Sequence, residues 1–284
     1  MTFFRSFSIL TSMKPISHMP REVARGIRYV LTDIDDTMTR GGILVPAAYA
    51  ALSALADAGL PVIAVTGRSA GWGEVHLQEW PIDAVIAENG AIAYFRRARG
   101  GPEVAGDSGP FGTLVDPSAA ENTASALLRA AKAAYGAVSR ARPAPDNHFR
   151  KYDYAIDHAE YVSPPLSADE VARIVGIFER EGCRAKPSSI HINCWIGNFD
   201  KCAASIALLR ALYGYDDEKD RSSVLYVGDA LNDEVMFAHF PNSCAVANVD
   251  LWLDRMTSHP SWVSSARYGE GFSEIARGVL SLRE

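Results

Sequence analysis

Residues 29–37 read YVLTDIDDT, an apolar run that ends in three carboxylates within four residues. A short run of this kind predicts a buried strand, and open α/β sheets bind ligands at the carboxyl ends of their strands. Asp33 and Asp35 are two residues apart, so both carboxylates face one spot in an extended chain. Like charges held close repel unless a cation neutralises them or one binds a proton. The pair suggests a magnesium-assisted nucleophile with an acid/base partner, and the alternative is a strand that ends in a polar turn.

Three further predicted strands also end in polar, small or charged residues. Thr66, Gly67 and Arg68 follow the run 61–65, residues 88–90 (ENG) follow the run 84–87, and residues 228–233 (GDALND) follow the run 223–227. Parallel strands bring their carboxyl ends to one edge of a sheet. Lys201 adds a cation at the start of a predicted helix. Several such strand ends together indicate a functional site, although Asp229 and Asp233 alone would be interpreted as helix caps.

The elements that position these residues alternate between strand and helix. We expect strands at 27–31, 61–65 and 84–87 with helices at 46–58 and 72–80, then a helix at 200–212, a strand at 223–227, a helix at 234–239 and a strand at 243–247. Repeated β-α-β units imply a parallel sheet with right-handed crossovers. Residues 268–272 (YGEGF) are expected to be a structural loop.

A different pattern interrupts this alternation. Residues 96–111 are rich in Arg, Gly and Pro and predict a loop or hairpin. They are followed by expected helices at 119–135 and 167–181 and strands at 152–156 and 188–196, and Ser167 with Glu170 forms a capping box. The predicted fold class is therefore α/β, a parallel-sheet Rossmann-like core (26–94 and 199–284) with an inserted smaller α+β domain (95–198). Residues 1–25 are expected to be a loosely ordered extension.

The composition of the chain limits the classes of protein to which it can belong. The chain has 284 residues, 48% hydrophobic and 22% charged, as expected for a globular protein with a sizeable core. Its net charge of −6 argues against nucleic-acid binding, and no apolar run approaches the roughly 20 residues that cross a bilayer. The four cysteines have no zinc-site spacing, so we expect reduced, buried thiols and a cytoplasmic location.

These motifs and their order resemble the haloacid dehalogenase (HAD) superfamily of phosphohydrolases. The resemblance is to the branch with a large cap after the third strand, which includes Cof-type, sucrose-phosphate and trehalose-phosphate phosphatases. Residues 33–37 (DIDDT) resemble the first motif of that family, Thr66 the second, Lys201 the third and residues 228–233 the fourth. By pattern, the resemblance covers about residues 28–94 and 195–275, and the inserted domain then corresponds to the cap.

The resemblance implies a role for each matching residue. Asp33 is the expected nucleophile, forming an aspartyl-phosphate, and Asp35 the general acid and base. Thr66 and nearby backbone N–H groups would hold the phosphoryl group, and Lys201 would orient Asp33. Mg²⁺ prefers hard oxygen ligands. Those expected here are Asp33, the backbone carbonyl of Asp35, Asp229 and, directly or through a water, Asp233. Asp36 is expected in a turn or beside the site.

Substrate contacts are assigned by position. Gly67 allows close backbone approach, while Arg68 is either a substrate contact or a salt-bridge partner. Asn89 and Gly90 form a tight turn or contribute to substrate binding or a hinge. Asn248 either lies near the metal, as the resemblance implies, or ends a strand. In the inserted domain, His191 and Asn193 alternate along a strand and are candidate substrate residues, with a structural His as the alternative. Arg150 and Lys151 are expected to be solvated, and the alternative is that they contact sugar hydroxyls or a second anionic group of the substrate.

The sequence thus predicts a Mg²⁺-dependent phosphatase that hydrolyses a small phosphate ester, with a sugar phosphate as the favoured class. No nucleic-acid or membrane partner is expected, and the oligomeric state is left open. One alternative is a sugar-phosphate mutase of the phosphomannomutase type, which shares the core chemistry. The other is a non-catalytic phosphometabolite-binding protein on the same fold.

Overall fold

The computed structural model describes residues 13–97, 110–119 and 124–284. The chain packs as two compact units. The first comprises the described part of Met1–Ala64, together with Pro187–Ile190 and Tyr213–Glu284, and the second comprises Val65–Lys186 and His191–Leu212. The boundaries of core and cap expected from the sequence stay a prediction.

A parallel sheet forms the centre of the first unit. Its strand order is β1-β15-β14-β13-β2-β5, with β2 at Tyr29–Thr32, β5 at Val62–Val65, β13 at Val224–Gly228 and β14 at Asn242–Ala245. Every pair in this part of the sheet is parallel. All residues of these four strands are buried, as expected for parallel strands covered on both faces. The register pairs Thr32 with Val227, so β2 and β13 end side by side.

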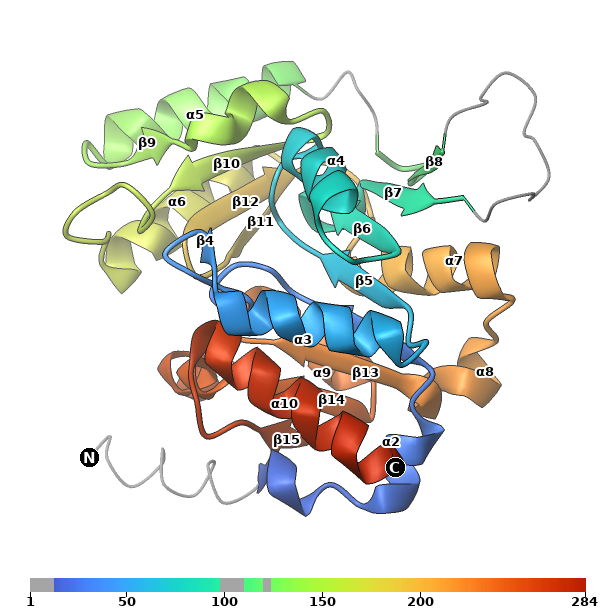
Figure 1. The fold of residues 1–284 in the computed structure, drawn as a ribbon. Helices are drawn as coiled ribbons and strands as arrows, with labels where there is room; N and C mark the ends of the chain where they lie inside the picture. The colour runs from blue at the N-terminus through green and yellow to red at the C-terminus, as the bar shows by residue number, and fades with distance from the viewer. Residues whose placement is uncertain (1–12, 98–109, 120–123) are drawn as a thin grey trace. The chain divides into compact units, whose positions relative to one another are not determined.

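Two helices pack together in the first unit, α3 (Pro46–Asp57) and α10 (Tyr268–Arg283) (Figure 1). Pro46 occupies the first turn of α3, where its missing N–H costs nothing. The expectation of a loop at 268–272 is wrong, because these residues begin α10. A Cβ on Gly269 would lie 2.5 Å from the Met38 carbonyl oxygen and from Val45 Cβ, so the glycine lets the helix approach closely.

The N-terminal expectation is also wrong for the residues that the structure describes. Lys14–Pro15 form β1, which pairs with β15 (Trp262–Val263), and α2 spans Arg21–Gly26. Met13, Ile16 and Met19 are buried. Apolar burial and sheet pairing therefore order this segment, while residues 1–12 lie outside the described part.

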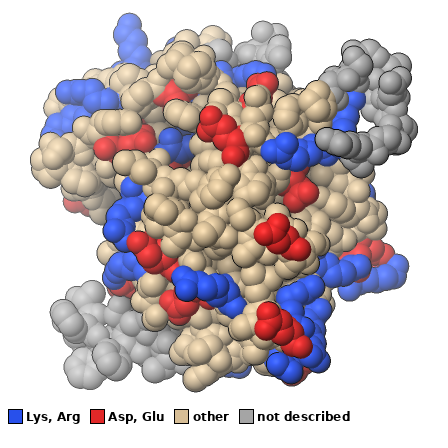
Figure 2. Space-filling model, in the orientation of Figure 1, with Lys and Arg blue, Asp and Glu red and all other residues tan. Residues whose placement is uncertain are grey.

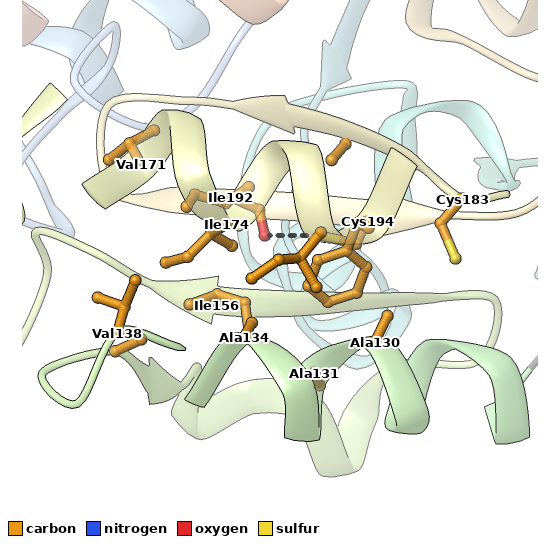
Figure 3. Packing of buried hydrophobic residues seen from close by; sticks show 14 of the residues in the cluster. Ala130, Ala131, Ala134, Val138, Ile156, Val171, Ile174, Cys183, Ile192 and Cys194 are labelled. Atoms are coloured by element: carbon orange, nitrogen blue, oxygen red, sulfur yellow. Dashed lines mark hydrogen bonds between the residues drawn. The ribbon is translucent and has the colours of Figure 1, made fainter. Parts of the chain in front are cut away.

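The second unit carries the inserted α+β module. A four-stranded antiparallel sheet has the order β11-β12-β10-β9, with β9 at Arg142–Pro143, β10 at Asp153–Asp157, β11 at Arg184–Pro187 and β12 at His191–Trp195. The helices α5 (Ala124–Ala137) and α6 (Ala168–Arg180) cover it, and Figure 3 shows Ala134, Ile156, Ile174 and Ile192 in one apolar cluster. Ser167 and Glu170 form the predicted capping box, while β11 was not predicted.

The remaining strands of the second unit form an antiparallel run, β6 (Ala84–Ala87), β7 (Ile92–Arg96) and β8 (Phe111–Val115). The predicted hairpin is confirmed by the pairing of β7 with β8, although residues 98–109 of its connection lie outside the described part. Helix α4 (Ala70–Glu79) packs on β6 and β7, and α7 spans Lys201–Tyr213.

The other elements are short. They are the strands β3 (Thr39–Arg40) and β4 (Ile43–Leu44), which pair with each other, and the helices α8 (Asp217–Asp220) and α9 (Glu234–His239). Among the described residues, no helix is long and apolar enough to span a membrane. Positive and negative side chains are interspersed on the face shown in Figure 2.

Candidate metal and catalytic site

Three buried carboxylates gather in the first unit. Asp33 directly follows β2, Asp229 directly follows β13, and Asp233 ends the 3-10 turn Leu231–Asp233. One oxygen from each carboxylate lies within 4.8 Å of the others. At most 3% of any of these residues is exposed. The parallel pairing of β2 with β13 therefore brings together residues almost 200 positions apart in the chain, and their oxygens suit a divalent cation.

Neutral donors fix the orientation of Asp229. Its Oδ1 accepts a hydrogen bond from the Thr37 hydroxyl at 3.1 Å, and its Oδ2 accepts one from Asn248 Nδ2 at 3.0 Å. Asn248 also donates to the Asp36 carbonyl and accepts from the Tyr268 N–H. Asn248 thus lies beside the acidic cluster, and its position agrees with the resemblance.

Asp233 has both carboxylate oxygens engaged. The Tyr226 hydroxyl donates to Oδ1 at 2.6 Å, and the backbone N–H groups of Asp229 and Ala230 donate to Oδ2. Asp233 therefore caps the turn as well as facing the cluster, so the two interpretations of this residue are compatible. A Cβ on Gly228 would lie 2.5 Å from Asp233 Oδ2, which explains the glycine before Asp229.

The cluster carries strong like-charge repulsion. Burial raises the pKa of Asp229 well above its ordinary value, and the nearby carboxylates of Asp233, Asp33 and Asp36 raise it further. Burial likewise raises the pKa of Tyr226, so its hydroxyl stays a donor to Asp233. A bound cation would remove this repulsion by favouring the ionised carboxylates. The donor set thus fits a hard divalent metal ion.

The two other carboxylates of the first motif, Asp35 and Asp36, have surroundings that differ from those of Asp33. Asp35 is buried, but its carboxylate is not part of the cluster, so the predicted metal contact through its backbone carbonyl stays a prediction. Asp36 has φ of 54°, its N–H donates to the Thr39 hydroxyl, and its Oδ1 accepts from the Gly41 N–H. Asp36 is thus the turn residue expected from the sequence.

The remaining predicted site residues lie in the second unit. The Thr66 hydroxyl accepts the N–H of Arg68 at 3.0 Å, which closes a tight turn after β5. Arg68 forms a salt bridge of 3.2 Å with Glu160, and Glu160 also lies 2.9 Å from His191 Nε2. Burial raises the pKa of Glu160, but the bonds from His191 and Arg68 lower it by more. Arg68 therefore forms a salt bridge, and its contact with a substrate stays a prediction.

Glu88 ties the next strand end to the inserted module. Its carboxylate accepts the backbone N–H groups of Ala70, Lys151, Tyr152 and Asp153. Glu88 and Asn89 both adopt left-handed conformations, with φ of 49° and 56°. Such strain is held by surrounding contacts and often marks functional sites. The expected turn at 88–90 is therefore present. The Glu88 carboxylate anchors it to the start of α4 and to residues 151–153.

The expectation of a solvated Arg150 is wrong. Its side chain is 1% exposed and donates to Asp153, Asp146 and the Gly67 carbonyl. Burial lowers the pKa of Arg150, but Asp153 and Asp146 raise it by more, so the guanidinium stays charged. Lys151 Nζ donates to the Tyr94 hydroxyl at 3.2 Å. Asp146 lies four residues before Arg150 and Asp153 lies three residues after it. This spacing in the sequence was the available signal for the two ion pairs.

Asn89, Asn193 and Gly67 lie together. A Cβ on Gly67 would be 2.5 Å from Asn193 Nδ2 and 3.2 Å from Asn89 Oδ1. Asn89 Nδ2 and Asn193 Oδ1 are buried, and neither has a hydrogen-bond partner among the described residues. An unsatisfied buried polar group costs about 1–3 kcal/mol. The amide atoms nearest to Gly67 are the other ends of these two side chains, Asn193 Nδ2 and Asn89 Oδ1.

Lys201 is the first residue of α7 and is 2% exposed. Gly90, with φ of 114°, lies directly against the Asp200 carbonyl, and any Cβ there would clash with it. The turn at 88–90 and the start of α7 are therefore packed together. This contact places Gly90 in a structural role, and its contribution to substrate binding stays a prediction.

The predicted site residues thus form two sets, one in each unit. The set of the first unit holds Asp33, Asp35, Asp229 and Asp233, and the set of the second unit holds Thr66, Gly67, Arg68, Asn89, Gly90, His191, Asn193 and Lys201. That both sets serve one active site stays a prediction. Sequence reasoning missed Thr37, Tyr226 and Glu160. Thr37 lies inside the first motif and could have been found, whereas Tyr226 and Glu160 follow no local pattern.

Comparisons with known proteins establish the fold. No protein-family model matches the chain, and no curated protein matches it. Among solved structures, a Thermoplasma acidophilum protein is 20% identical with a TM-score of 0.66, covering 90% of this chain and 99% of that chain. A protein described as a HAD/COF-like hydrolase from Plasmodium vivax is 20% identical with a TM-score of 0.65, covering 93% and 100%.

A third structure is the sucrose-phosphatase from Synechocystis sp. PCC6803 in complex with sucrose and phosphate, 14% identical with a TM-score of 0.59, covering 91% of this chain and 98% of that chain. The similarity extends over nearly the whole of each chain, whereas the sequence identities are low. It therefore bears on the arrangement of the elements and not on the substrate. The chain shares its fold with these solved structures, one of which is described as a HAD/COF-like hydrolase.

Proposed function

We propose that the protein is a Mg²⁺-dependent phosphatase that hydrolyses a small phosphorylated metabolite through an aspartyl-phosphate intermediate. The observation that carries the proposal is the buried cluster of Asp33, Asp229 and Asp233 at the ends of two parallel strands, with Asp35 two residues after Asp33. Phosphoryl transfer depends mainly on positioning and on neutralising charge, and this cluster is suited to both. The four cysteines are free, and three of them are buried as predicted, whereas Cys202 is half-buried. A cytoplasmic location stays part of the proposal.

In this proposal each carboxylate has a separate task. Asp229 and Asp233 would hold Mg²⁺ together with Asp33, and the ion would offset the negative charge of the phosphoryl group. An oxygen of Asp33 bonds to phosphorus while the ester P–O bond breaks, and Asp35 gives its proton to the leaving oxygen. Asp35 then takes a proton from water, whose oxygen attacks phosphorus and releases phosphate and Asp33.

A sugar phosphate is the proposed substrate class. The likeness in fold to the sucrose-phosphatase supports this choice at the level of the fold only. The buried polar side chains Asn89, Asn193 and His191 of the second unit also suit a leaving group with hydroxyls. Thr66 is proposed to hold the phosphoryl group, and Lys201 is proposed to orient Asp33 and to offset the charge of the phosphate.

The direct test is phosphate release from a panel of sugar phosphates with and without Mg²⁺. We expect the wild type to release phosphate. Asp33→Asn should lower the rate of phosphate release at least about 10³-fold, because the nucleophile is removed. Asp57→Asn, which changes an exposed carboxylate, should alter this rate little. Equal phosphate release by the wild type and Asp33→Asn would refute the mechanism. Conversion of mannose 1-phosphate to an isomer without free phosphate would favour the mutase, and binding without turnover would favour the non-catalytic alternative.

A further inference from the structure

A cavity of about 350 Å³ lies between helix α7 and the strands β7 and β8, within the second unit. Ala93 and Leu114 line it from the sheet, where they lie opposite each other in the pairing of β7 with β8. The residues that line it from α7 are Ala204, Ala207 and Ala211. β8 is the last strand in the order of the sheet, and Val115, which also lines the cavity, is 39% exposed (Figure 1). The cavity is therefore accessible from solvent at this edge of the sheet.

The space exists because the residues on the helix side are small. Positions 204, 207 and 211 are three and four residues apart, so their side chains share one face of α7. Pockets that bind small organic molecules have volumes of about 300–1,000 Å³ and mostly apolar linings, and an apolar cavity of roughly 150 Å³ holds one benzene. A volume of about 350 Å³ therefore suits an apolar body of two fused rings.

Two charged residues line the same cavity, Asp116 and Arg210. Asp116 Oδ1 accepts hydrogen bonds from the Ser118 N–H at 2.7 Å and from the Ser118 hydroxyl at 2.6 Å. Arg210 is exposed, and among the residues that the structure describes its guanidinium has no ion pair or hydrogen bond. A guanidinium binds a carboxylate through two parallel N–H···O bonds. The charged group that is left to bind a ligand is therefore a cation, which favours an anionic group on that ligand.

We infer that this cavity is a binding site for a small aromatic carboxylate, whose rings lie between α7 and the strands β7 and β8 and whose carboxylate binds Arg210. Of the residues predicted for the phosphatase site, Gly90 alone belongs to the described lining of the cavity. The inference therefore goes beyond the proposed function and does not depend on it. Because Gly90 is shared, the position of the ligand has to be tested by competition with phosphate.

The test measures the binding of 2-naphthoate, a two-ring carboxylate, to the full chain by isothermal titration calorimetry. We expect the wild type to bind it with a dissociation constant below about 1 mM, in keeping with a ligand of this size. Ala207→Leu should weaken binding at least about tenfold, because the larger side chain occupies the cavity. Ala203→Leu is the matched control, since it makes the same change at an exposed position of α7 outside the lining, and it should bind like the wild type. Circular dichroism confirms that each variant is folded.

The role of the carboxylate is tested with 2-naphthol, which has the same rings and is neutral. Arg210→Gln should weaken the binding of 2-naphthoate about fivefold, the effect of one partly exposed ion pair, and leave the affinity for 2-naphthol unchanged. Arg210 also lies in the last turn of α7, where a cation complements the helix dipole. If that is its whole role, Arg210→Gln lowers Tm without changing either affinity, and the inference is wrong.

Three further results would overturn the site. They are no binding of 2-naphthoate to the wild type, equal affinity in the wild type and Ala207→Leu, and an equal loss in Ala203→Leu. Displacement of 2-naphthoate by excess inorganic phosphate with Mg²⁺ would place it in the proposed phosphatase site instead. A wild-type dimer in sedimentation that Ala207→Leu dissociates would show that a second copy of the chain covers the cavity. None of these measurements requires turnover, so failure of the phosphatase proposal leaves them unaffected.

Discussion

At the scale of single residues, the acidic cluster combines burial with like charge. The pKa of Asp229 is raised by burial and by the neighbouring carboxylates, while Thr37 and Asn248 orient its oxygens. Without a cation this arrangement destabilises the folded protein. A cation that binds the folded form alone shifts the unfolding equilibrium toward the native state by mass action. The site should therefore be detectable by stability measurements without any substrate.

We predict that Mg²⁺ stabilises the wild type. At about 100 times its dissociation constant, Mg²⁺ should add about 2.7 kcal/mol and raise Tm by roughly 5–10 °C. Asp229→Asn should lose this increase, because one charged ligand is removed. The measurement is differential scanning fluorimetry with Mg²⁺ or EDTA, followed in both proteins.

The control is Asp250→Asn, which removes an exposed carboxylate paired with Arg267 in the same unit. This variant should keep the full Mg²⁺ response. An undiminished response in Asp229→Asn would place the metal away from the cluster.

At the scale of elements, the start of α10 depends on small residues. A Cβ on Gly269 would clash with the Met38 carbonyl and Val45, whereas a Cβ on Gly278 of the same helix would lie 3.5 Å from Ile16 Cγ1, an ordinary contact distance. The same substitution at these two positions therefore tests packing separately from helix propensity. Glycine in a helix interior costs about 1 kcal/mol relative to alanine where no clash arises.

We predict that Gly269→Ala lowers the free energy of unfolding by about 1–3 kcal/mol, because the added methyl group overpacks the contact with Val45. Gly278→Ala should be neutral or stabilise by up to about 1 kcal/mol. Urea denaturation followed by circular dichroism measures both. Similar values for the two variants would show that the close approach of α10 is not required.

At the scale of the whole molecule, each unit has its own buried residues and its own polar network. The second unit contains the apolar cluster of α5, α6, β10 and β12, and also the buried ion pairs of Arg150 with Asp146 and Asp153. Removal of Arg150 would leave Asp146 and Asp153 as uncompensated buried charges, and breaking a buried ion pair in this way costs about 3–5 kcal/mol. Arg150 also donates to the Gly67 carbonyl, so its loss should loosen the turn that carries Thr66.

We predict that Arg150→Ala destabilises the second unit selectively. Hydrogen exchange measured by mass spectrometry should rise in β10 and β12 and remain near the wild-type level in β13 and β14, because these strands belong to different units. Arg184→Ala, which removes an exposed partner of Asn198, should leave exchange in all four strands unchanged. An equal rise in all four strands would show that the units open together.

Much of the fold follows from local patterns. The capping box of Ser167 and Glu170 and the proline start of α3 depend on neighbours within a few residues, and both were predicted correctly. The N-terminal segment and α10 were not, because Ile16 and Gly269 owe their conformations to distant contacts. A glycine-rich segment such as 268–272 is typical of a loop until the partner that requires its small residues is known.

The sequence by itself determined where the carboxylates of the proposed site lie in the chain: Asp33, Asp35, Asp229 and Asp233 follow apolar runs, and a parallel sheet gathers the ends of its strands. Only the tertiary structure decided how the polar groups pair. Thr37 bonds to Asp229 across 192 positions, Arg150 is buried between two acids, and Asn89 meets Asn193 beside Gly67. The physical reason is that hydrogen bonds and burial depend on distance in space, which residue type and spacing define only within one element.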